Sequence, residues 1–294
     1  MAHMIPIGTM VNANRAVQVI PAAARLGFEC FQINFWLSTG TVDVQKEFPR
    51  ILEAAQACGT LISSIGLYGN PLWQHGEYAD TLASFERIID AAHLLQAPLI
   101  TGFTGRLPEG PLPDSLPRFK EVWGELARRC ADKDLKIAWE NCDMGDTWQQ
   151  GHWNMATIPD AWELLFDALP LDNVGLEWEP AHQMYHLIDP IPQLRKWAHK
   201  ILHLHGKDAT IDWDVIRQHG IRGPVQTIHD RTPGFGDSNW TDIISILRQH
   251  HYMGTIDIEG FHDPIYRDEL EWTGQVRALR YLKDCRGGDY VPNL

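Results

Sequence analysis

The sequence lacks any apolar run close to the roughly 18 residues that a membrane-spanning helix needs. It has no CxxC pair, and its 5 cysteines are scattered and odd in number, which disfavours a disulfide framework and a cysteine-rich zinc site. The first residues, MAHMIPIGTM, contain neither a basic segment nor a long apolar core, so a signal peptide is not expected. We therefore expect a cytoplasmic protein with no membrane partner, with Met4 as the natural start and residues 1–3 as a cloning remnant.

Basic residues are also scarce, with 25 Lys and Arg against 38 Asp and Glu and a net charge of −13. An acidic surface repels phosphate backbones, so we expect no nucleic-acid partner. Acidity suits a site that gathers carboxylates around a divalent cation, but it does not predict one by itself. The composition leaves open whether the chain forms a homo-oligomer.

Short apolar segments alternate with amphipathic ones along the chain, with no Pro- or Ser-rich linker between them. Strands are predicted at 5–10, 28–35, 61–67, 98–104, 135–141, 173–179, 200–206 and 255–261. Helices are predicted at 13–26, 43–58, 77–96, 115–132, 158–168, 190–199, 239–251 and 268–284. Eight such units favour a closed (β/α)8 TIM barrel over an open doubly wound sheet. We expect one α/β domain over residues 1–294, with 285–294 as a C-terminal tail.

Four consecutive predicted strands end in acidic or imidazole side chains: Glu140, then Glu177 and Glu179, then His203 and His205, then Glu259. In a TIM barrel the catalytic groups lie at these strand ends. A lone Glu or His there is usually solvated or hydrogen-bonded. Side chains alternate along a strand, however, so one register points Glu140, Glu179, His205 and Glu259 inward together. Their neighbours Trp139, Trp178, Leu204 and Ile258 are all apolar, as that register requires.

Three carboxylates and one imidazole on a barrel axis would repel one another and be costly to bury unless a cation lay between them. We therefore predict one divalent metal. The oxygen-rich ligand set favours Mn²⁺ and leaves Mg²⁺, Co²⁺, Fe²⁺ and Zn²⁺ open. Glu177 and His203 lie two residues before the proposed ligands and are expected to form a buried pair behind the metal. The alternative is a twisted strand with Glu177 exposed.

Five segments resemble the sugar phosphate isomerase/epimerase superfamily of xylose isomerase-like TIM barrels. They are ENC at 140–142, EPAH at 179–182, HLHGKDA at 203–209, RTPGFGDSNW at 231–240 and IDIEG at 256–260. The resemblance covers essentially the whole chain and extends to ketose 3-epimerases and inosose dehydratase-type proteins. It implies metal ligation by Glu140, Glu179, His205 and Glu259, with His182 on the substrate. Because the family usually has Asp where this chain has Glu179, Glu177 stays open as the ligand.

A metal held in this way can bind a carbonyl and its neighbouring hydroxyl, and loss of the proton between them gives a stabilised enediolate. This chemistry predicts a metal-dependent sugar isomerase or epimerase. By the same resemblance, Glu140 and Glu259 are the acid and base on opposite faces of the reacting carbon. His182, Lys207 and Asp208 would hold hydroxyls, as would Arg231 unless it pairs with Asp230 or Asp237.

Two polar loops carry aromatic residues that suit the apolar faces of sugar rings, namely Trp73 and His75 in one and Trp148 and Trp153 in the other. They predict a substrate larger than a free triose, such as a keto-sugar or a glycoside bearing a second group. No Gly-rich phosphate cradle lies nearby, which favours an unphosphorylated sugar.

Other functions use the same scaffold. A lyase that dehydrates a keto-inositol, or cleaves a C-glycoside bond in a 3-keto sugar, starts with the same proton abstraction, so the metal site does not discriminate it. An apurinic-site endonuclease resembles the fold with a histidine-richer zinc site and a basic surface, which the charge of −13 opposes. A non-catalytic sugar-binding barrel has little use for a four-ligand metal site.

Overall fold

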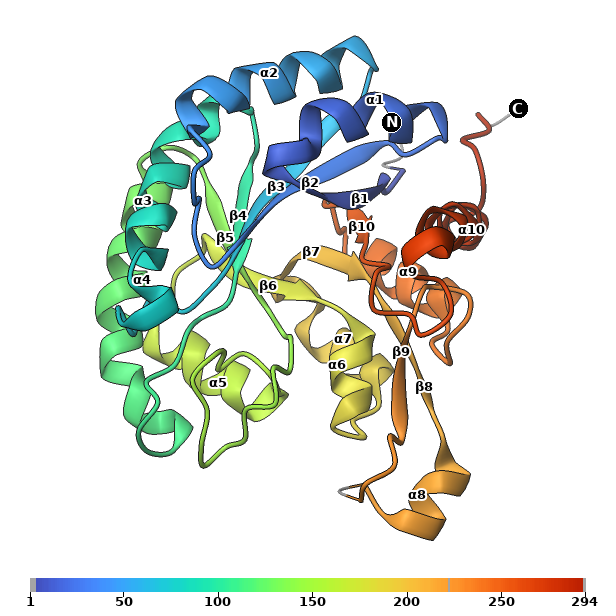
Figure 1. The fold of residues 1–294 in the computed structure, drawn as a ribbon. Coiled ribbons are helices and arrows are strands. Elements are labelled where there is room, and N and C mark those ends of the chain that lie inside the picture. The colour runs from blue at the N-terminus through green and yellow to red at the C-terminus, as the bar shows by residue number, and fades with distance from the viewer. Residues whose placement is uncertain (1–3, 222, 293–294) are drawn as a thin grey trace.

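The computed structural model describes residues 4–221 and 223–292 and confirms the predicted TIM barrel (Figure 1). Eight parallel strands close in the order β1-β10-β7-β6-β5-β4-β3-β2. They are β1 (Ile7–Asn12), β2 (Cys30–Trp36), β3 (Leu61–Tyr68), β4 (Leu99–Gly102), β5 (Lys136–Glu140), β6 (Val174–Trp178), β7 (Ile201–Gly206) and β10 (Ile256–Ile258). Each predicted strand has a counterpart. The expected cloning remnant at 1–3 lies outside the described residues.

The outer helices also follow the predicted positions and surround the barrel (Figure 1). They are α1 (Ala16–Arg25), α2 (Val44–Ala57), α3 (Thr81–Ala91), α4 (Leu116–Ala131), α5 (Pro159–Ala168), α7 (Pro190–Trp197), α9 (Trp240–Gln249) and α10 (Glu271–Cys285). Short 3-10 turns lie at Ala13–Arg15, Gly76–Tyr78, Ala92–Leu94, Leu112–Ser115, Ala198–Lys200 and Asp268–Leu270. No helix in the described part of the chain is long and apolar enough to cross a membrane.

Three elements and a short helix were not predicted. After β7 the chain leaves the barrel as a hairpin of β8 (Asp208–Ile211), α8 (Trp213–His219) and β9 (Ile228–Arg231), which projects below it in Figure 1. The two strands are antiparallel, with Asp208 opposite Arg231. The short helix is α6 (Pro180–Tyr185), which begins directly after Glu179. These segments are short and their polar and apolar residues do not alternate cleanly, so periodicity alone could not find them.

The strand register follows the predicted alternation. The Trp139 ring packs on Phe119 and Trp123 of α4 and on Phe166 of α5, with centroid distances of 5.1, 5.7 and 5.9 Å. The Trp178 indole is fully buried and donates a hydrogen bond of 2.8 Å to Gln183 Oε1. Because these rings face the helices, the flanking Glu140 and Glu177 side chains point into the barrel.

Arg286, which follows helix α10, contacts residues near the start of the barrel. Arg286 donates to both carboxylate oxygens of Glu29, at 2.6 and 2.8 Å, and to the carbonyl of Ile5 at 2.9 Å. Helix α10 includes Cys285, and Arg286 is buried, so the described part of the expected tail leaves the barrel only after these two residues.

Candidate active site

The four side chains predicted from the sequence to be metal ligands are buried at the carboxyl end of the barrel. Glu140 ends β5, His205 lies near the end of β7, and Glu259 follows β10. Glu179 follows β6, and its backbone N–H and carbonyl are both bonded by the Asn141 side chain, at 2.8 and 3.0 Å. The Asn of the ENC segment therefore holds the main chain of Glu179 in place across the two strands.

Glu140, His205 and Glu259 form one cluster. His205 Nδ1 lies 2.7 Å from Glu140 Oε1 and 3.3 Å from Glu259 Oε2. One possible ligand atom from each residue lies within 4.8 Å of the others, a spacing that could hold a metal ion. Burial raises the pKa of Glu140 to about 8, against the opposing charge of His205. A nearby cation would stabilise the ionised form of this buried carboxyl group.

Glu179 lies beside this cluster and is unsatisfied. The residue is fully buried, and neither of its carboxylate oxygens receives a hydrogen bond. His182 Nε2 is 2.8 Å from Oε1 without hydrogen-bond alignment, and Lys207 Nζ is 3.9 Å away. Burial raises the pKa of Glu179 to about 8, although Lys207 opposes the shift. A buried carboxylate without donors is costly, so its free oxygens fit a bound cation.

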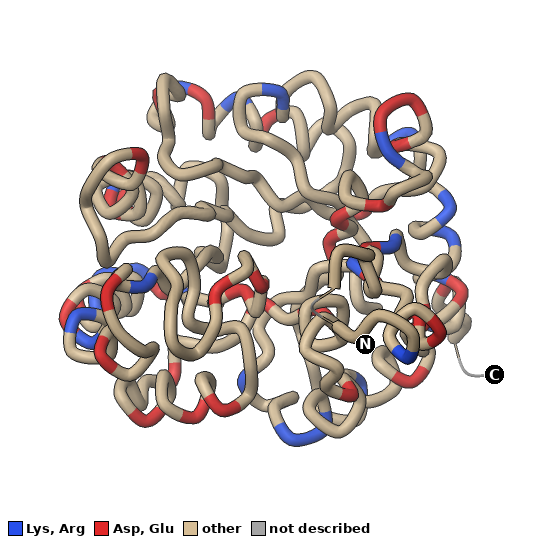
Figure 2. Tube along the Cα trace, turned by 60° about the horizontal axis from the view of Figure 1, so that its bottom comes forward, with Lys and Arg blue, Asp and Glu red and all other residues tan. Residues whose placement is uncertain are grey.

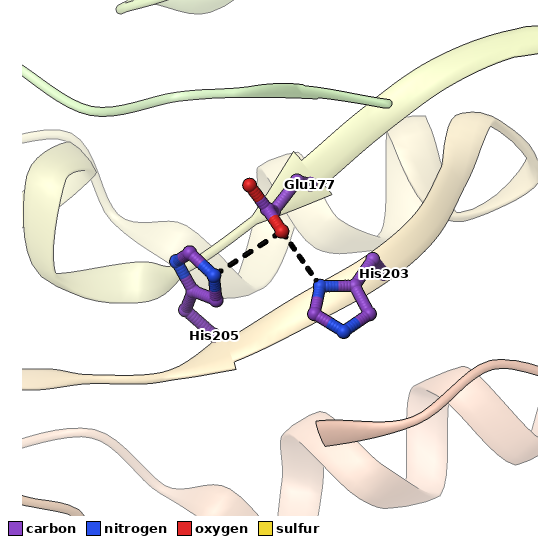
Figure 3. Close-up of side chains that lie close together, drawn as sticks. All are labelled: Glu177, His203 and His205. Atoms are coloured by element: carbon purple, nitrogen blue, oxygen red, sulfur yellow. Dashed lines mark ion pairs between the residues drawn. The ribbon is translucent and has the colours of Figure 1, made fainter. Parts of the chain in front are cut away.

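Glu177 has no free oxygen of this kind. Its Oε1 accepts a hydrogen bond of 2.6 Å from Gln32, and its Oε2 accepts one of 2.9 Å from Tyr68. Oε1 also makes ion-pair contacts with His203 Nδ1 at 2.8 Å and His205 Nε2 at 3.1 Å (Figure 3). Burial alone would raise the pKa of Glu177, but the two histidines outweigh burial and lower it. The carboxylate is thus satisfied by protein groups alone.

Glu177, His203 and His205 form a second group with metal-compatible spacing. His203 is buried between two carboxylates, since its Nε2 lies 2.6 Å from Asp257 Oδ2 on β10. Burial would lower the pKa of His203, but Asp257 and Glu177 outweigh burial and raise it. The charged groups of this second group are paired with one another and with Asp257. We therefore interpret Glu177 and His203 as the predicted buried pair behind the first cluster.

A cavity of about 710 Å³ opens above the first cluster. Its titratable lining includes Glu140, His182, Lys207, Asp230, Glu259 and His262. Lys207 Nζ lies 3.1 Å from His182 Nε2 and 3.1 Å from Glu259 Oε1. Burial, together with Lys207, lowers the pKa of His182 to about 3, so its ring is neutral. Lys207 and His182 therefore present one cationic and one neutral polar group to the cavity.

Two other predicted substrate residues are engaged elsewhere. Asp208 is fully buried, and its carboxylate accepts hydrogen bonds from the Ser238 N–H at 3.1 Å and from Trp240 Nε1 at 3.0 Å. Arg231 Nε donates to Asp263 at 3.1 Å, so its ion-pair partner is neither of the two aspartates considered from the sequence. Both contacts fasten the unpredicted hairpin and its following loop to the barrel.

None of the four predicted aromatic residues of the loops lines this cavity, although Trp73 and Trp153 both pack on Tyr78, with ring centroids 5.9 and 5.3 Å apart. Trp73 and His75 line a separate hollow with His152, and Trp148 lines another beside the hairpin. Trp153 lies behind the cavity wall, 5.7 Å from the ring of Trp36.

Sequence reasoning missed several residues that the barrel brings to the site. Gln32 and Tyr68 bond to Glu177, and Asp257 holds His203. Trp36, Asp230 and Phe261 line the cavity. Gln32, a polar residue inside the apolar strand FECFQINF, was a signal that could have been used. The others lie on strands, except Phe261, which follows β10, and only the tertiary structure shows which side chains they meet.

The barrel belongs to a defined family of proteins. The family model described as "Xylose isomerase-like TIM barrel" matches residues 20–284. The chain therefore belongs to the xylose isomerase-like TIM barrel family, as the resemblance implied.

Among curated proteins, the inosose dehydratase of Clostridium tetani is 24% identical over 190 residues, covering 60% of this chain and 59% of the relative. The chain thus matches about three fifths of the length of that relative.

Solved structures share the fold over nearly the whole length. A xylose isomerase domain protein from Planctomyces limnophilus has a TM-score of 0.74 at 20% identity, covering 97% of this chain and 98% of that one. The 3-keto-D-glucoside 4-epimerase of E. coli has a TM-score of 0.70 at 16% identity, covering 96% and 100%. A D-psicose 3-epimerase has a TM-score of 0.71 at 16% identity, covering 97% and 100%. At these identities the likeness shows the fold alone.

The distribution of charged residues is relevant to the alternative function of an apurinic-site endonuclease. In the described part of the chain, Lys and Arg are interspersed with Asp and Glu around the outer helices (Figure 2). This arrangement gives no support to a DNA-facing basic surface.

Proposed function

We propose that this protein is a divalent-metal-dependent isomerase or epimerase of carbohydrate metabolism that removes a proton beside the carbonyl of an unphosphorylated keto-sugar or sugar derivative. The observation that carries the proposal is the buried cluster of Glu140, His205 and Glu259 beside the unsatisfied carboxylate of Glu179. This cluster lies at the base of a cavity large enough for a sugar.

The proposed ligands are Glu140, Glu179, His205 and Glu259, with Mn²⁺ as the first choice among cations that prefer oxygen. A divalent cation bound there would polarise a carbonyl and stabilise negative charge on its oxygen. Glu179 rather than Glu177 is the proposed fourth ligand, because only Glu179 has both oxygens free of hydrogen bonds.

Side chains of the protein are proposed to transfer the proton and to bind the sugar. Glu140 and Glu259 both line the cavity from strands on different sides of β7, so we assign them the removal and return of the proton. Neutral His182 and cationic Lys207 lie 3.1 Å apart on the same cavity and are placed to hold sugar hydroxyls. Asp208 and Arg231 are proposed to act indirectly, by fixing the loops around the cavity.

The test is a screen of keto-sugars with added Mn²⁺ in deuterated water, followed by NMR. An active substrate should gain deuterium at the carbon beside its carbonyl and yield its epimer or isomer. Glu140→Gln and Glu259→Gln should each abolish exchange, while Glu163→Gln, at an exposed ion pair with Lys196, should not. Absence of exchange for every sugar and cation would contradict the proposal.

A lyase is the second candidate, because the curated relative is named an inosose dehydratase. Water would then leave a keto-inositol or keto-sugar after the same proton abstraction, or a C-glycoside bond would break. The same NMR experiment separates the two: an epimerase returns labelled substrate and epimer, whereas a lyase loses a group and accumulates a dehydrated or cleaved product.

We also propose a reducing, cytoplasmic setting. All five cysteines are free, and three of them, Cys30, Cys130 and Cys142, are buried.

A further inference from the structure

The cavity above the cluster has two chemically different sides. The titratable residues come from β5 and β9 and from the segments that follow β6, β7 and β10. Six apolar side chains also line the cavity, mainly from the first half of the barrel, and we call them the apolar wall. They are Met10, Phe35, Trp36, Phe103, Met144 and Phe261. The polar side chains of Asn12, Asn34 and Tyr68 line the cavity from β1, β2 and β3.

Two aromatic rings of the apolar wall are exposed although they line one cavity. Trp36 is 54% exposed and Phe261 is 53% exposed. A single exposed apolar side chain is ordinary, but two aromatic rings on one concave surface are typical of a binding site.

The Trp36 ring is held in place despite its exposure. It lies 5.7 Å from the Trp153 ring and meets Phe103 edge-on at 6.4 Å. Phe103 in turn packs on Tyr68 at 5.2 Å. A ring fixed in this way loses little conformational freedom when a ligand stacks on it, which favours binding.

The size and polarity of the cavity limit what can fill it. Its volume of about 710 Å³ falls within the roughly 300–1,000 Å³ of small-molecule sites, which leaves room for a second group beside a sugar. Among the six side chains of the apolar wall, only the Trp36 indole N–H is a strong hydrogen-bond donor, so most sugar hydroxyls placed against them would lose their bonds to water. A sugar is better placed against His182 and Lys207, which leaves the apolar wall for another part of the substrate.

We propose that the apolar wall is a subsite for a planar apolar group, such as an aryl aglycone, attached to the sugar. The inference rests on the proposed function in one respect, which is that the sugar itself occupies the titratable side. It names the second group of the substrate and assigns Trp36 and Phe261 to its recognition.

The test compares the binding of phenyl β-D-glucopyranoside and methyl β-D-glucopyranoside by titration calorimetry with Mn²⁺ present. Neither probe carries the ketone, so binding is measured without turnover. Stacking on an aromatic ring should make the phenyl glucoside bind about five to ten times more tightly. Trp36→Ala and Phe261→Ala should each reduce this preference, and the double variant should remove it.

Trp213→Ala is the matched control, because Trp213 is 48% exposed on α8 and does not line this cavity. It should leave the preference intact. Trp36 and Phe261 are half exposed, so their variants should fold, and thermal unfolding midpoints close to that of the unmodified chain will establish this.

The outcomes separate the inference from the proposed function. A phenyl preference that depends on Trp36, without deuterium exchange in any keto-sugar, supports the subsite and contradicts the proposed reaction. Equal binding of the two glucosides by a chain that does exchange keto-sugars overturns the subsite and leaves the reaction standing. The subsite is also overturned if the unmodified chain binds both glucosides equally and is a dimer that Trp36→Asp converts to a monomer. In that case a second copy of the chain covers the apolar wall.

Discussion

His203 Nδ1 lies 2.8 Å from Glu177 Oε1, deep in the barrel and directly behind the histidine that contacts Glu140. The pair, together with the Gln32 and Tyr68 bonds to the same carboxylate, fixes where His205 can point. Groups in this position usually orient a metal-binding histidine and tune its basicity.

Glu177→Gln should therefore weaken Mn²⁺ binding by roughly tenfold to a hundredfold, the range seen when such supporting partners are lost. The amide keeps the shape of the side chain but removes the charge that faces His203 and His205. Titration calorimetry on metal-free protein measures the change, with Glu163→Gln as the exposed control. An unchanged affinity would refute the role assigned to the pair.

Glu179→Gln should separate metal binding from folding. In the metal-free protein the buried carboxylate has no hydrogen-bond donor, so neutralising it should leave the melting temperature unchanged or raise it. Added Mn²⁺ should stabilise the unmodified chain by about 2.7 kcal/mol at a hundred times its Kd. The variant should show little of this shift in thermal unfolding. A full metal-induced shift in the variant would exclude Glu179 as a ligand.

Lys207→Met should tighten Mn²⁺ binding and slow turnover. Lys207 Nζ lies 3.1 Å from Glu259 and 3.9 Å from Glu179, so its charge competes with a cation for both carboxylates. Removing that charge should improve the affinity by about tenfold or more at the effective dielectric of a protein site. Lys196→Met, at an exposed pair, is the control for calorimetry. Weaker metal binding in Lys207→Met would contradict this electrostatic account.

The Glu29–Arg286 contact predicts a pH dependence of stability. Burial would raise the pKa of Glu29, but hydrogen bonds from Arg286, Ile7 and Lys283 outweigh burial and lower it from 4.5 to about 2. The stabilisation is therefore complete above pH 4.5 and is lost as the pH falls towards 2. Because the carboxylate is partly exposed, we expect Glu29→Gln to cost about 2 kcal/mol at pH 7.

Chemical denaturation of Glu29→Gln and the unmodified chain at several pH values tests this account. The difference between them should shrink as the pH falls below 4.5. Glu121→Gln, at an exposed pair with Arg118, should show no such difference. A constant difference at all pH values would mean that the charge of Glu29 is not the source of the stability.

Much of the fold could be predicted because local physics and global architecture agree. Alternating apolar segments such as KIAWE in β5 require one face towards the helices, and Trp139 occupies that face. Once the strands are parallel and eight in number, their ends must meet. The grouping of Glu140, His205 and Glu259 follows from that geometry.

The hairpin from Asp208 to Arg231 could not be predicted in the same way. Its two strands are four residues each, and α8 has no buried residue to impose a helical period. Its position depends on long-range contacts, such as the bond from Trp240 to Asp208. Aromatic residues illustrate the same limit, since Trp36 at the end of β2 lines the cavity while the loop residues Trp73 and His75 line a different hollow.

The sequence by itself determined the eightfold alternation and which strand ends carry carboxylate and imidazole groups, because both follow from residue order and side-chain periodicity. Only the tertiary structure decided which carboxylates are satisfied. Glu177 and Glu179 are two residues apart on one segment, yet Gln32 and Tyr68 donate hydrogen bonds to the first, and the second receives none. That difference arises from side chains on two other strands, whose approach depends on closure of the barrel.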